Sequence, residues 1–243
     1  MNIKKKFNKI TTIGGWMQTS SLDNAEILSK SDFDWITIDL EHGNISNEKL
    51  KNMTRVIQAN KKSVFARIPS NDPLIVGNIL DSGVNGIIIP HIKNAKQVKN
   101  IIDKAFYPPL KNRGIGFSKS NDYGSSLKAS LKKNRELVVI AMIENKEGFK
   151  NLNKILKVEY LDGVFIGPYD LSASLNLFEK FNDKKFLKVI EKIKNITLNK
   201  KKLCGIHVVN FNKGELKKRV KEGYNFIAYS MDTVVMRGYK KKN

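Results

Sequence analysis

The stretch VFIGPYDLSASL, residues Val164 to Leu175, is an apolar run that leads directly into the sequence Gly-Pro-Tyr-Asp at 167–170. The run Val-Phe-Ile contains no polar residue, which is typical of a strand that is buried on both faces of a parallel sheet. A Gly-Pro pair directly after such a strand indicates a tight turn. The segment therefore predicts a buried parallel strand that holds Asp170 rigidly just beyond its C-terminal end.

Similar apolar runs recur along the chain and alternate with amphipathic stretches. The runs that we expect to be strands are Ile10–Met17, Trp35–Leu40, Val64–Ile68, Gly86–Pro90, Leu137–Ile143, Gly163–Ile166, Leu203–Val209 and Phe226–Met231. The stretches that we expect to be helices are Asp23–Ser29, Asn47–Asn60, Pro73–Ser82, Ala95–Phe106, Ser125–Lys133, Phe149–Leu156, Asp183–Asn199 and Gly214–Glu222. The expected N-caps are Asp23, Asn47, Asp72 and Asn94, and the expected terminal glycines are Gly83 and Gly223.

This order of elements predicts the fold class. Strands that alternate with helices are typical of parallel sheets with helical crossovers. Eight strands within 243 residues predict an α/β fold of the (β/α)8 TIM-barrel type, formed as a single domain by residues 1–243. A doubly wound open sheet is the alternative. No Pro/Ser-rich linker and no low-complexity block suggests a domain boundary within the chain.

The composition favours a soluble protein in a reducing compartment. No segment approaches the 18 or so consecutive apolar residues of a membrane span. The N-terminal lysines are not followed by the continuous apolar run of a signal peptide. The single cysteine, Cys204, permits no internal disulfide, as is usual for cytosolic proteins. We therefore expect a cytoplasmic protein without a membrane partner.

The net charge of +21, from 44 Lys and Arg against 23 Asp and Glu, has two interpretations. A basic surface of this size could bind nucleic acid or an anionic membrane. The lysines, however, are scattered through every expected helix and seldom lie beside aromatic residues, whereas a nucleic-acid groove needs both charge and stacking surfaces. The distribution favours a general enrichment in lysine and predicts no specific nucleic-acid partner.

Polar residues at the C-terminal ends of the expected strands are the candidates for function, because these ends form the active-site face of a (β/α)8 barrel. The second strand continues as Asp-Leu-Glu-His at 39–42. The alternation of side chains along a strand points Asp39 and Glu41 into the barrel. Buried carboxylates are costly unless they are paired or bind a cation. Asp39 alone could merely cap the following loop, but together with Glu41 and His42 it indicates a functional site.

Three further strand ends carry charged residues that we expect at the same face. Arg67 ends the third strand, Glu144 follows the fifth and Asp170 follows the sixth. Glu144 and Asp170 come from neighbouring strands, so that their carboxylates should converge. Such a pair can share a proton, act as general acid and base, or hold a divalent ion with several coordination positions left open. We interpret Asp170 as a metal ligand.

These motifs, in this order, resemble those of the HpcH/HpaI aldolase family. The matching segments are Asp-x-Glu-His at 39–42, the arginine at 67, Tyr-Pro-Pro and Arg-Gly-Ile-Gly within 107–116, Ile-Glu at 143–144 and Gly-Pro-x-Asp-Leu-Ser at 167–172. The resemblance extends from about Trp16 to Thr233. It implies a (β/α)8 barrel with metal-dependent pyruvate aldolase activity.

The resemblance also implies roles for individual residues. Glu144 and Asp170 correspond to the two acids that bind a divalent ion, Mg²⁺, Mn²⁺ or Co²⁺. His42, oriented by Asp39, corresponds to the dyad for proton transfer, and Arg67 to the arginine at the keto oxygen. The residues expected to contact substrate are Trp16, Arg67, Met142, Gly167, Tyr169 through its backbone N–H, and His207. The family also forms homo-oligomers, which we expect here.

Several positions depart from the family pattern. Met142 stands where members often have glutamine, and Lys119 is a possible substitute for an arginine that is often found after Gly116. His91 and His207 occupy positions near the strand ends that are often apolar. A histidine inside a barrel is usually packed against its neighbours, but an exposed one would shape the pocket for the aldehyde.

The prediction from the sequence is a divalent-metal-dependent aldolase that reversibly cleaves a 4-hydroxy-2-oxo acid, such as a 2-keto-3-deoxy sugar acid or a 4-hydroxy-2-oxo diacid, to pyruvate and an aldehyde. A lysine inside the barrel would be needed for Schiff-base chemistry, and no expected strand end carries one. The first alternative is another carbon–carbon lyase or a decarboxylase that acts on a 2-oxo acid or an acyl thioester. A basic nucleic-acid-binding protein is the second.

Overall fold

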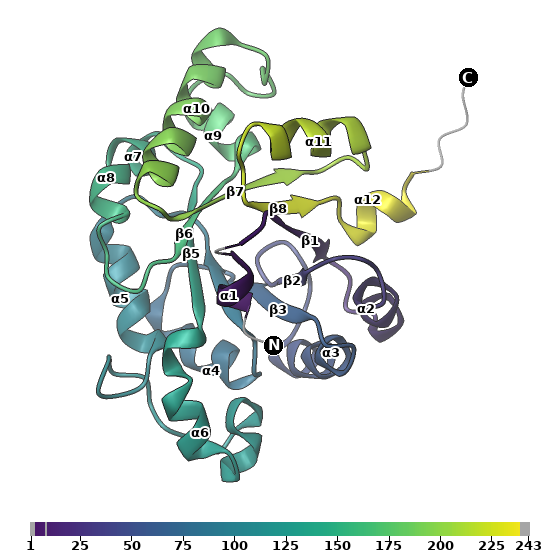
Figure 1. Cartoon of the computed structure of the whole chain (residues 1–243), viewed down its shortest axis with the longest axis vertical. Coiled ribbons are helices and arrows are strands. Elements are labelled where there is room, and N and C mark those ends of the chain that lie inside the picture. The colour runs from purple at the N-terminus through teal and green to yellow at the C-terminus, as the bar shows by residue number, and fades with distance from the viewer. Residues whose placement is uncertain (1–2, 8, 239–243) are drawn as a thin grey trace.

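Eight parallel strands close into a barrel in the computed structural model, which describes residues 3–7 and 9–238 (Figure 1). Each strand pairs with the next in the chain, and β1 pairs with β8. The strands are β1 (Thr12–Met17), β2 (Trp35–Asp39), β3 (Ser63–Arg67), β4 (Gly86–Ile89), β5 (Val138–Ile143), β6 (Gly163–Ile166), β7 (Leu203–Val208) and β8 (Phe226–Tyr229). The predicted (β/α)8 barrel is confirmed, and the open sheet is excluded.

The helices surround the barrel, apart from α1, which lies across the strands in Figure 1. They are α1 (Ile3–Phe7), α2 (Leu22–Ser29), α3 (Asn47–Ala59), α4 (Val76–Asp81), α5 (Ala95–Ala105), α6 (Leu127–Lys132), α7 (Lys146–Lys150), α8 (Leu152–Ile155), α9 (Pro168–Ser174), α10 (Lys184–Asn199), α11 (Lys213–Lys221) and α12 (Asp232–Met236). The short 3-10 helices are η1 (Pro73–Ile75), η2 (Lys119–Gly124) and η3 (Asn134–Glu136). Within the described residues, no helix is long and apolar enough to cross a membrane.

The expected caps are correct for two helices and wrong for two others. Asp72 caps η1 and Asn94 caps α5, as the sequence predicts. The caps of α2 and α3 are instead Ser21 and Ser46, whose hydroxyls accept the backbone N–H groups three residues on. The predictions that Asp23 and Asn47 are N-caps are therefore wrong, since both lie inside their helices. A serine hydroxyl caps as well as an aspartate or asparagine side chain does.

The structure differs from the predicted turn at Gly-Pro. Pro168 is the first residue of α9, and Asp170 lies in the first turn of this helix. Proline is well suited to this place, because the first helical residue has no intrahelical use for its N–H. Asp170 is thus held by a short helix rather than by a loop. The stretch expected as one helix from Phe149 to Leu156 is also different, since it is divided between α7 and α8.

Two hydrophobic clusters hold the barrel, one on each side of the sheet. Along β2, Ile36 and Ile38 belong to the large outer cluster between strands and helices. Trp35 belongs to the inner cluster, which fills the barrel together with residues such as Phe65 and Phe226. Thr37 and Asp39 on this inner face are also fully buried. The predicted alternation is therefore confirmed for β2, and it directs the polar end of that face towards the C-terminal mouth.

Three of the inner aromatic residues lie beside a glycine of the neighbouring strand. A Cβ atom at each of these glycines would lie between 2.0 and 2.4 Å from a ring carbon of the aromatic partner. Carbon atoms that are not bonded cannot approach so closely, so that only glycine admits the ring. The pairs are Gly14 with Trp35, Gly86 with Phe65, and Gly205 with Phe165.

The α1 helix, which the sequence analysis did not predict, packs at the N-terminal end of the strands. Its Ile3 and Phe7 are buried in the inner cluster, and the Phe7 ring meets the Phe226 ring edge-on at 5.6 Å. With this end filled by apolar side chains, the C-terminal ends of the strands are left for a polar site.

Candidate active site

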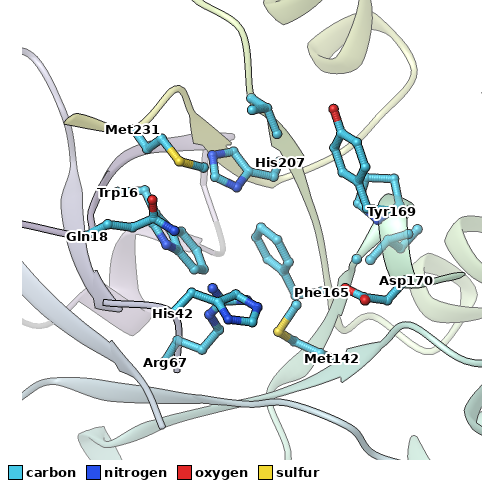
Figure 2. Close-up of a pocket in the computed structure, with 14 residues that line it drawn as sticks. Trp16, Gln18, His42, Arg67, Met142, Phe165, Tyr169, Asp170, His207 and Met231 are labelled. Atoms are coloured by element: carbon cyan, nitrogen blue, oxygen red, sulfur yellow. The ribbon is translucent and has the colours of Figure 1, made fainter. Parts of the chain in front are cut away.

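A cavity of about 340 Å³ opens at the C-terminal ends of the strands (Figure 2). Its walls contain the predicted site residues apart from Asp39, Glu41 and Glu144, which are not part of the lining. The lining residues are Trp16, Gln18, His42, Arg67, Met142, Phe165, Ile166, Gly167, Pro168, Tyr169, Asp170, His207, Val209 and Met231. No lysine is among these lining residues.

The most extensively bonded residue of the site is Asp39, at the end of β2. Its carboxylate accepts two hydrogen bonds from Arg67, from Nε at 2.8 Å and from Nη2 at 2.5 Å. Asp39 is completely buried, and Arg67 is 8% exposed. Burial alone would raise the pKa of Asp39, but the hydrogen bonds and the charge of Arg67 hold that pKa below its ordinary value. The pair is therefore ionised and fixes the guanidinium in the cavity wall.

Asp39 also joins β1 and the loop after β2 to this pair. The Trp16 indole and the Gln18 amide donate to Oδ2 at 3.3 and 3.2 Å. The backbone N–H groups of Glu41 and His42 donate to Oδ1 at 3.1 and 3.2 Å. The contact between Asp39 and His42 is therefore with the backbone of His42. The imidazole itself is 60% exposed, and its Nε2 lies 4.0 Å from Glu41 Oε2.

Glu41 contributes a second buried carboxylate with an unusual environment. Its Oε2 lies 2.9 Å from Arg67 Nη1, and its Oε1 lies 2.7 Å from His91 Nε2. Neither contact has hydrogen-bond geometry, so that both oxygens are buried without a directed donor. His91 also reaches Glu144: its backbone N–H donates to Glu144 Oε1, and its Nδ1 lies 3.2 Å from the same oxygen.

His91 is thus not the packed histidine that is usual inside a barrel. Its side chain is 56% exposed and lies between two acidic groups. Its backbone has a φ of 56°, in the left-handed region that non-glycine residues rarely adopt. In this conformation the backbone N–H of His91 donates to Glu144 Oε1.

Glu144, at the end of β5, is 2% exposed. Burial raises the pKa of Glu144, while the backbone N–H and the charge of His91 act in the opposite direction; Glu41 and Asp170 add repulsion. Gly167 lies against this carboxylate, because a Cβ at Gly167 would lie 2.9 Å from Glu144 Oε2. A larger residue at 167 would displace the acid, which gives Gly167 a steric role.

Glu144 and Asp170 form the candidate place for a divalent ion. Asp170 lines the cavity, and its charge reaches Glu144. A buried carboxylate that is disfavoured as an anion, beside a second carboxylate and an open cavity, fits a hard cation with oxygen ligands. Across residues 3–7 and 9–238, no group of three or more His, Cys, Asp or Glu side chains gathers as a metal site. An ion bound here would take its remaining ligands from water and substrate.

Gln18 is a residue of this site that the sequence analysis missed. Its amide donates to Asp39, and its Oε1 accepts from the Thr233 hydroxyl at 3.0 Å. Asp232 supports the same loop by accepting the backbone N–H groups of Gln18 and Thr19. The available signal was the position of Gln18 as the first polar residue after β1. By contrast, Lys119 donates to Gln58 on the outside of the barrel and is not part of the cavity lining.

Known proteins of one family are similar to this chain. A sequence model described as HpcH/HpaI aldolase/citrate lyase matches residues 12–238. A hydroxypyruvate/pyruvate aldolase of Roseobacter denitrificans is 29% identical, with 93% of this chain and 88% of the relative aligned. A 2-keto-3-deoxy-L-rhamnonate aldolase of Salmonella gallinarum is 30% identical over 93% of this chain and 84% of its own length.

Solved structures agree with this similarity. An HpcH/HpaI aldolase from Desulfitobacterium hafniense superposes with a TM-score of 0.90 at 25% identity, covering 98% of this chain and 93% of the other. A family protein from Burkholderia cenocepacia superposes with a TM-score of 0.91 at 22% identity, covering 97% and 95%. At 22% identity, the comparison with the Burkholderia cenocepacia protein supports the fold alone.

Proposed function

The chain belongs to the HpcH/HpaI aldolase/citrate lyase family, and from this we propose that it is a carbon–carbon lyase, a metal-dependent aldolase that reversibly cleaves a 4-hydroxy-2-oxo acid to pyruvate and an aldehyde. The relatives of about 30% identity are named as aldolases. The observation that carries the proposal is the arrangement of Arg67, Glu144 and Asp170 about one cavity at the strand ends.

The residues suit the charge changes of this reaction. Cleavage of the C3–C4 bond leaves negative charge on the oxygen of the 2-keto group. A divalent ion held by Glu144 and Asp170 would supply Lewis-acid polarisation of that oxygen. The Arg67 guanidinium, held rigidly by Asp39, would stabilise the same charge as it develops. Because Arg67 is already in place before the reaction, little reorganisation is needed.

The remaining predicted residues serve binding and proton transfer in this proposal. Tyr169 lies in the first turn of α9, where its backbone N–H has no intrahelical acceptor and is available to the substrate carboxylate. His42 would accept the proton of the C4 hydroxyl, directly or through a water molecule. The exposure of its imidazole supports this role, since the proton can then pass to solvent.

Removal of the divalent ion should abolish the aldol reaction. Treatment with EDTA, followed by gel filtration, is expected to leave no measurable cleavage, and Mg²⁺, Mn²⁺ or Co²⁺ should restore it. The assay combines pyruvate with a panel of aldehydes in the synthetic direction and identifies the products by NMR. Full activity in a protein shown to be free of metal by elemental analysis would refute the proposal. Release of CO₂ or of a thiol from a thioester would instead favour the decarboxylase or thioester-lyase alternative.

We also propose that the enzyme works in the cytoplasm as a homo-oligomer without a specific nucleic-acid partner. The single cysteine, Cys204, permits no internal disulfide, which suits a reducing compartment. Beside the short α12, the exposed side chains of Phe211 and Val235 line an apolar surface cavity of about 430 Å³. Light scattering should report a mass well above the 27.6 kDa of one chain.

A further inference from the structure

We propose that His207 makes this enzyme select uncharged aldehydes that carry a hydroxyl group, by accepting a hydrogen bond from that hydroxyl at Nδ1. This inference rests on the proposed aldolase function and adds the class of the second substrate. His207 lies on β7 and lines the cavity. In Figure 2 it lies with Met231 on the side of the cavity away from Arg67 and Met142.

The structure fixes which nitrogen of His207 carries the proton. Nε2 lies 3.0 Å from the carbonyl oxygen of Ser230. A carbonyl oxygen can only accept, so that Nε2 must be the donor. Ser230 has a φ of 59°, in the left-handed region, and its N–H donates to the carbonyl of Val208 at 2.7 Å. The backbone thus holds the Ser230 carbonyl in place, and with it the orientation of the imidazole.

With Nε2 protonated, Nδ1 of the neutral ring is an acceptor. Burial lowers the pKa of His207 to about 4, and the nearby charge of Arg67 contributes in the same direction, so that the ring is neutral at neutral pH. The imidazole packs against the Trp16 indole with ring centres 5.0 Å apart. Within the described residues, the single hydrogen bond of this side chain is the one from Nε2. Nδ1 therefore remains free for a donor on the substrate.

Other acceptors of the lining, on Gln18, His42 and Asp170, come from other elements than β7, and the residues named next give a hydroxyl no acceptor. Phe165, Val209 and Met231 are apolar. The Arg67 guanidinium in the lining already lies against the carboxylates of Asp39 and Glu41. A neutral aldehyde with a hydroxyl group can satisfy Nδ1, whereas an apolar one leaves it unpaired and an acidic one is buried without a partner.

The test uses pairs of aldehydes in which a methyl group replaces the hydroxyl. Glycolaldehyde is compared with propanal, and lactaldehyde with 2-methylpropanal, each with pyruvate and Mg²⁺, and kcat/KM is referred to the unhydrated aldehyde. A methyl analogue leaves the buried Nδ1 acceptor without a donor, and this typically lowers kcat/KM by about 10- to 100-fold relative to the hydroxylated aldehyde. We expect the hydroxylated member to be preferred by a ratio in this range, and succinic semialdehyde to react more slowly than lactaldehyde.

Two variants separate the acceptor from the shape of the pocket. His207→Phe keeps an aromatic ring against Trp16 but removes the acceptor, and should bring both ratios close to one. His207→Asn can place an amide oxygen near the position of Nδ1 and should recover part of the preference. Circular dichroism and the melting temperature of both variants show whether they remain folded.

The outcomes distinguish this inference from the aldolase proposal. If the wild-type enzyme forms aldol products with ratios near one, or if His207→Phe keeps the wild-type ratios, the role of His207 is wrong and the aldolase function stands. If no aldehyde gives a product in the presence of metal, the proposed function fails and this inference fails with it.

Discussion

Glu144→Gln should reduce the aldol reaction by about 10³-fold, since a charged ligand of a catalytic divalent ion contributes several kcal/mol to the transition state. Asp170→Asn should have a similar effect. The fold should survive in both. Burial raises the pKa of Glu144, which means that the folded protein disfavours its anion. The neutral amide avoids that desolvation cost and can still accept the N–H of His91. We therefore expect Glu144→Gln to melt at the same temperature as the wild type or higher.

The decisive measurement for Glu144 is metal binding in the absence of turnover. Titration with Mn²⁺, followed by the EPR signal of the free ion, should show weaker binding in Glu144→Gln and Asp170→Asn than in the wild type. Glu147→Gln is the matched control, because Glu147 lies three residues further on, is 63% exposed and contacts Lys93. Wild-type Mn²⁺ affinity in Glu144→Gln would remove Glu144 from the ligand set.

Arg67→Ala is expected to damage both catalysis and stability. Loss of a preorganised donor to developing negative charge typically costs about 10²–10³-fold in rate. The same change leaves Asp39, which is fully buried, and Glu41 without their cation. Breaking a buried ion pair by removing one partner costs about 3–5 kcal/mol in the free energy of unfolding. Arg67→Lys should recover only part of either loss, because an ammonium cannot reproduce the paired contacts of the planar guanidinium.

The two effects of Arg67→Ala are separable with a second buried arginine. Arg113 is also 8% exposed and pairs with Asp81 at 2.7 Å, away from the cavity. Urea unfolding should show destabilisation for both Arg67→Ala and Arg113→Ala. Exchange of the pyruvate methyl protons and aldol cleavage, measured at a temperature where both variants are folded, should fall only for Arg67→Ala. A folded Arg67→Ala protein with wild-type rates would exclude the proposed role of Arg67.

The barrel could be predicted from the sequence, because the hydrophobic pattern within each segment identifies that segment as a strand or a helix. Continuous apolar runs specify strands buried on both faces, and the strand boundaries agree with the structure to within about two residues. The α1 and α9 helices were missed for physical reasons. The five residues of α1 contain a single apolar pair at helical spacing, Ile3 and Phe7, which is too short a pattern to identify a helix. Gly-Pro is equally suitable for a turn and for the first turn of a helix.

The places of the candidate residues along the strands could be predicted from the sequence, but the contacts between their side chains could not. The strand alternation placed Asp39 on the inner face, and the structure has it fully buried at the end of β2. Glu41 lies beyond the end of this strand, with a side chain that is 6% exposed. Their partners depend on the stagger of neighbouring strands and on loop conformations, which a single sequence does not contain. The hydrogen bonds from Arg67 to Asp39 and the approach of His91 to two carboxylates could therefore be learned only from the structure.

The glycine–aromatic pairs inside the barrel have a consequence for how this sequence can diverge. A methyl group at Gly205 would overlap the Phe165 ring, and one at Gly14 would overlap Trp35. A glycine of such a pair can be replaced by a larger residue only after the aromatic residue on the neighbouring strand has been replaced by a smaller one. A larger residue introduced beside the intact ring would overlap it and destabilise the fold. Mutational paths through the interior must therefore pass through an under-filled intermediate, with the aromatic residue reduced before the glycine is replaced.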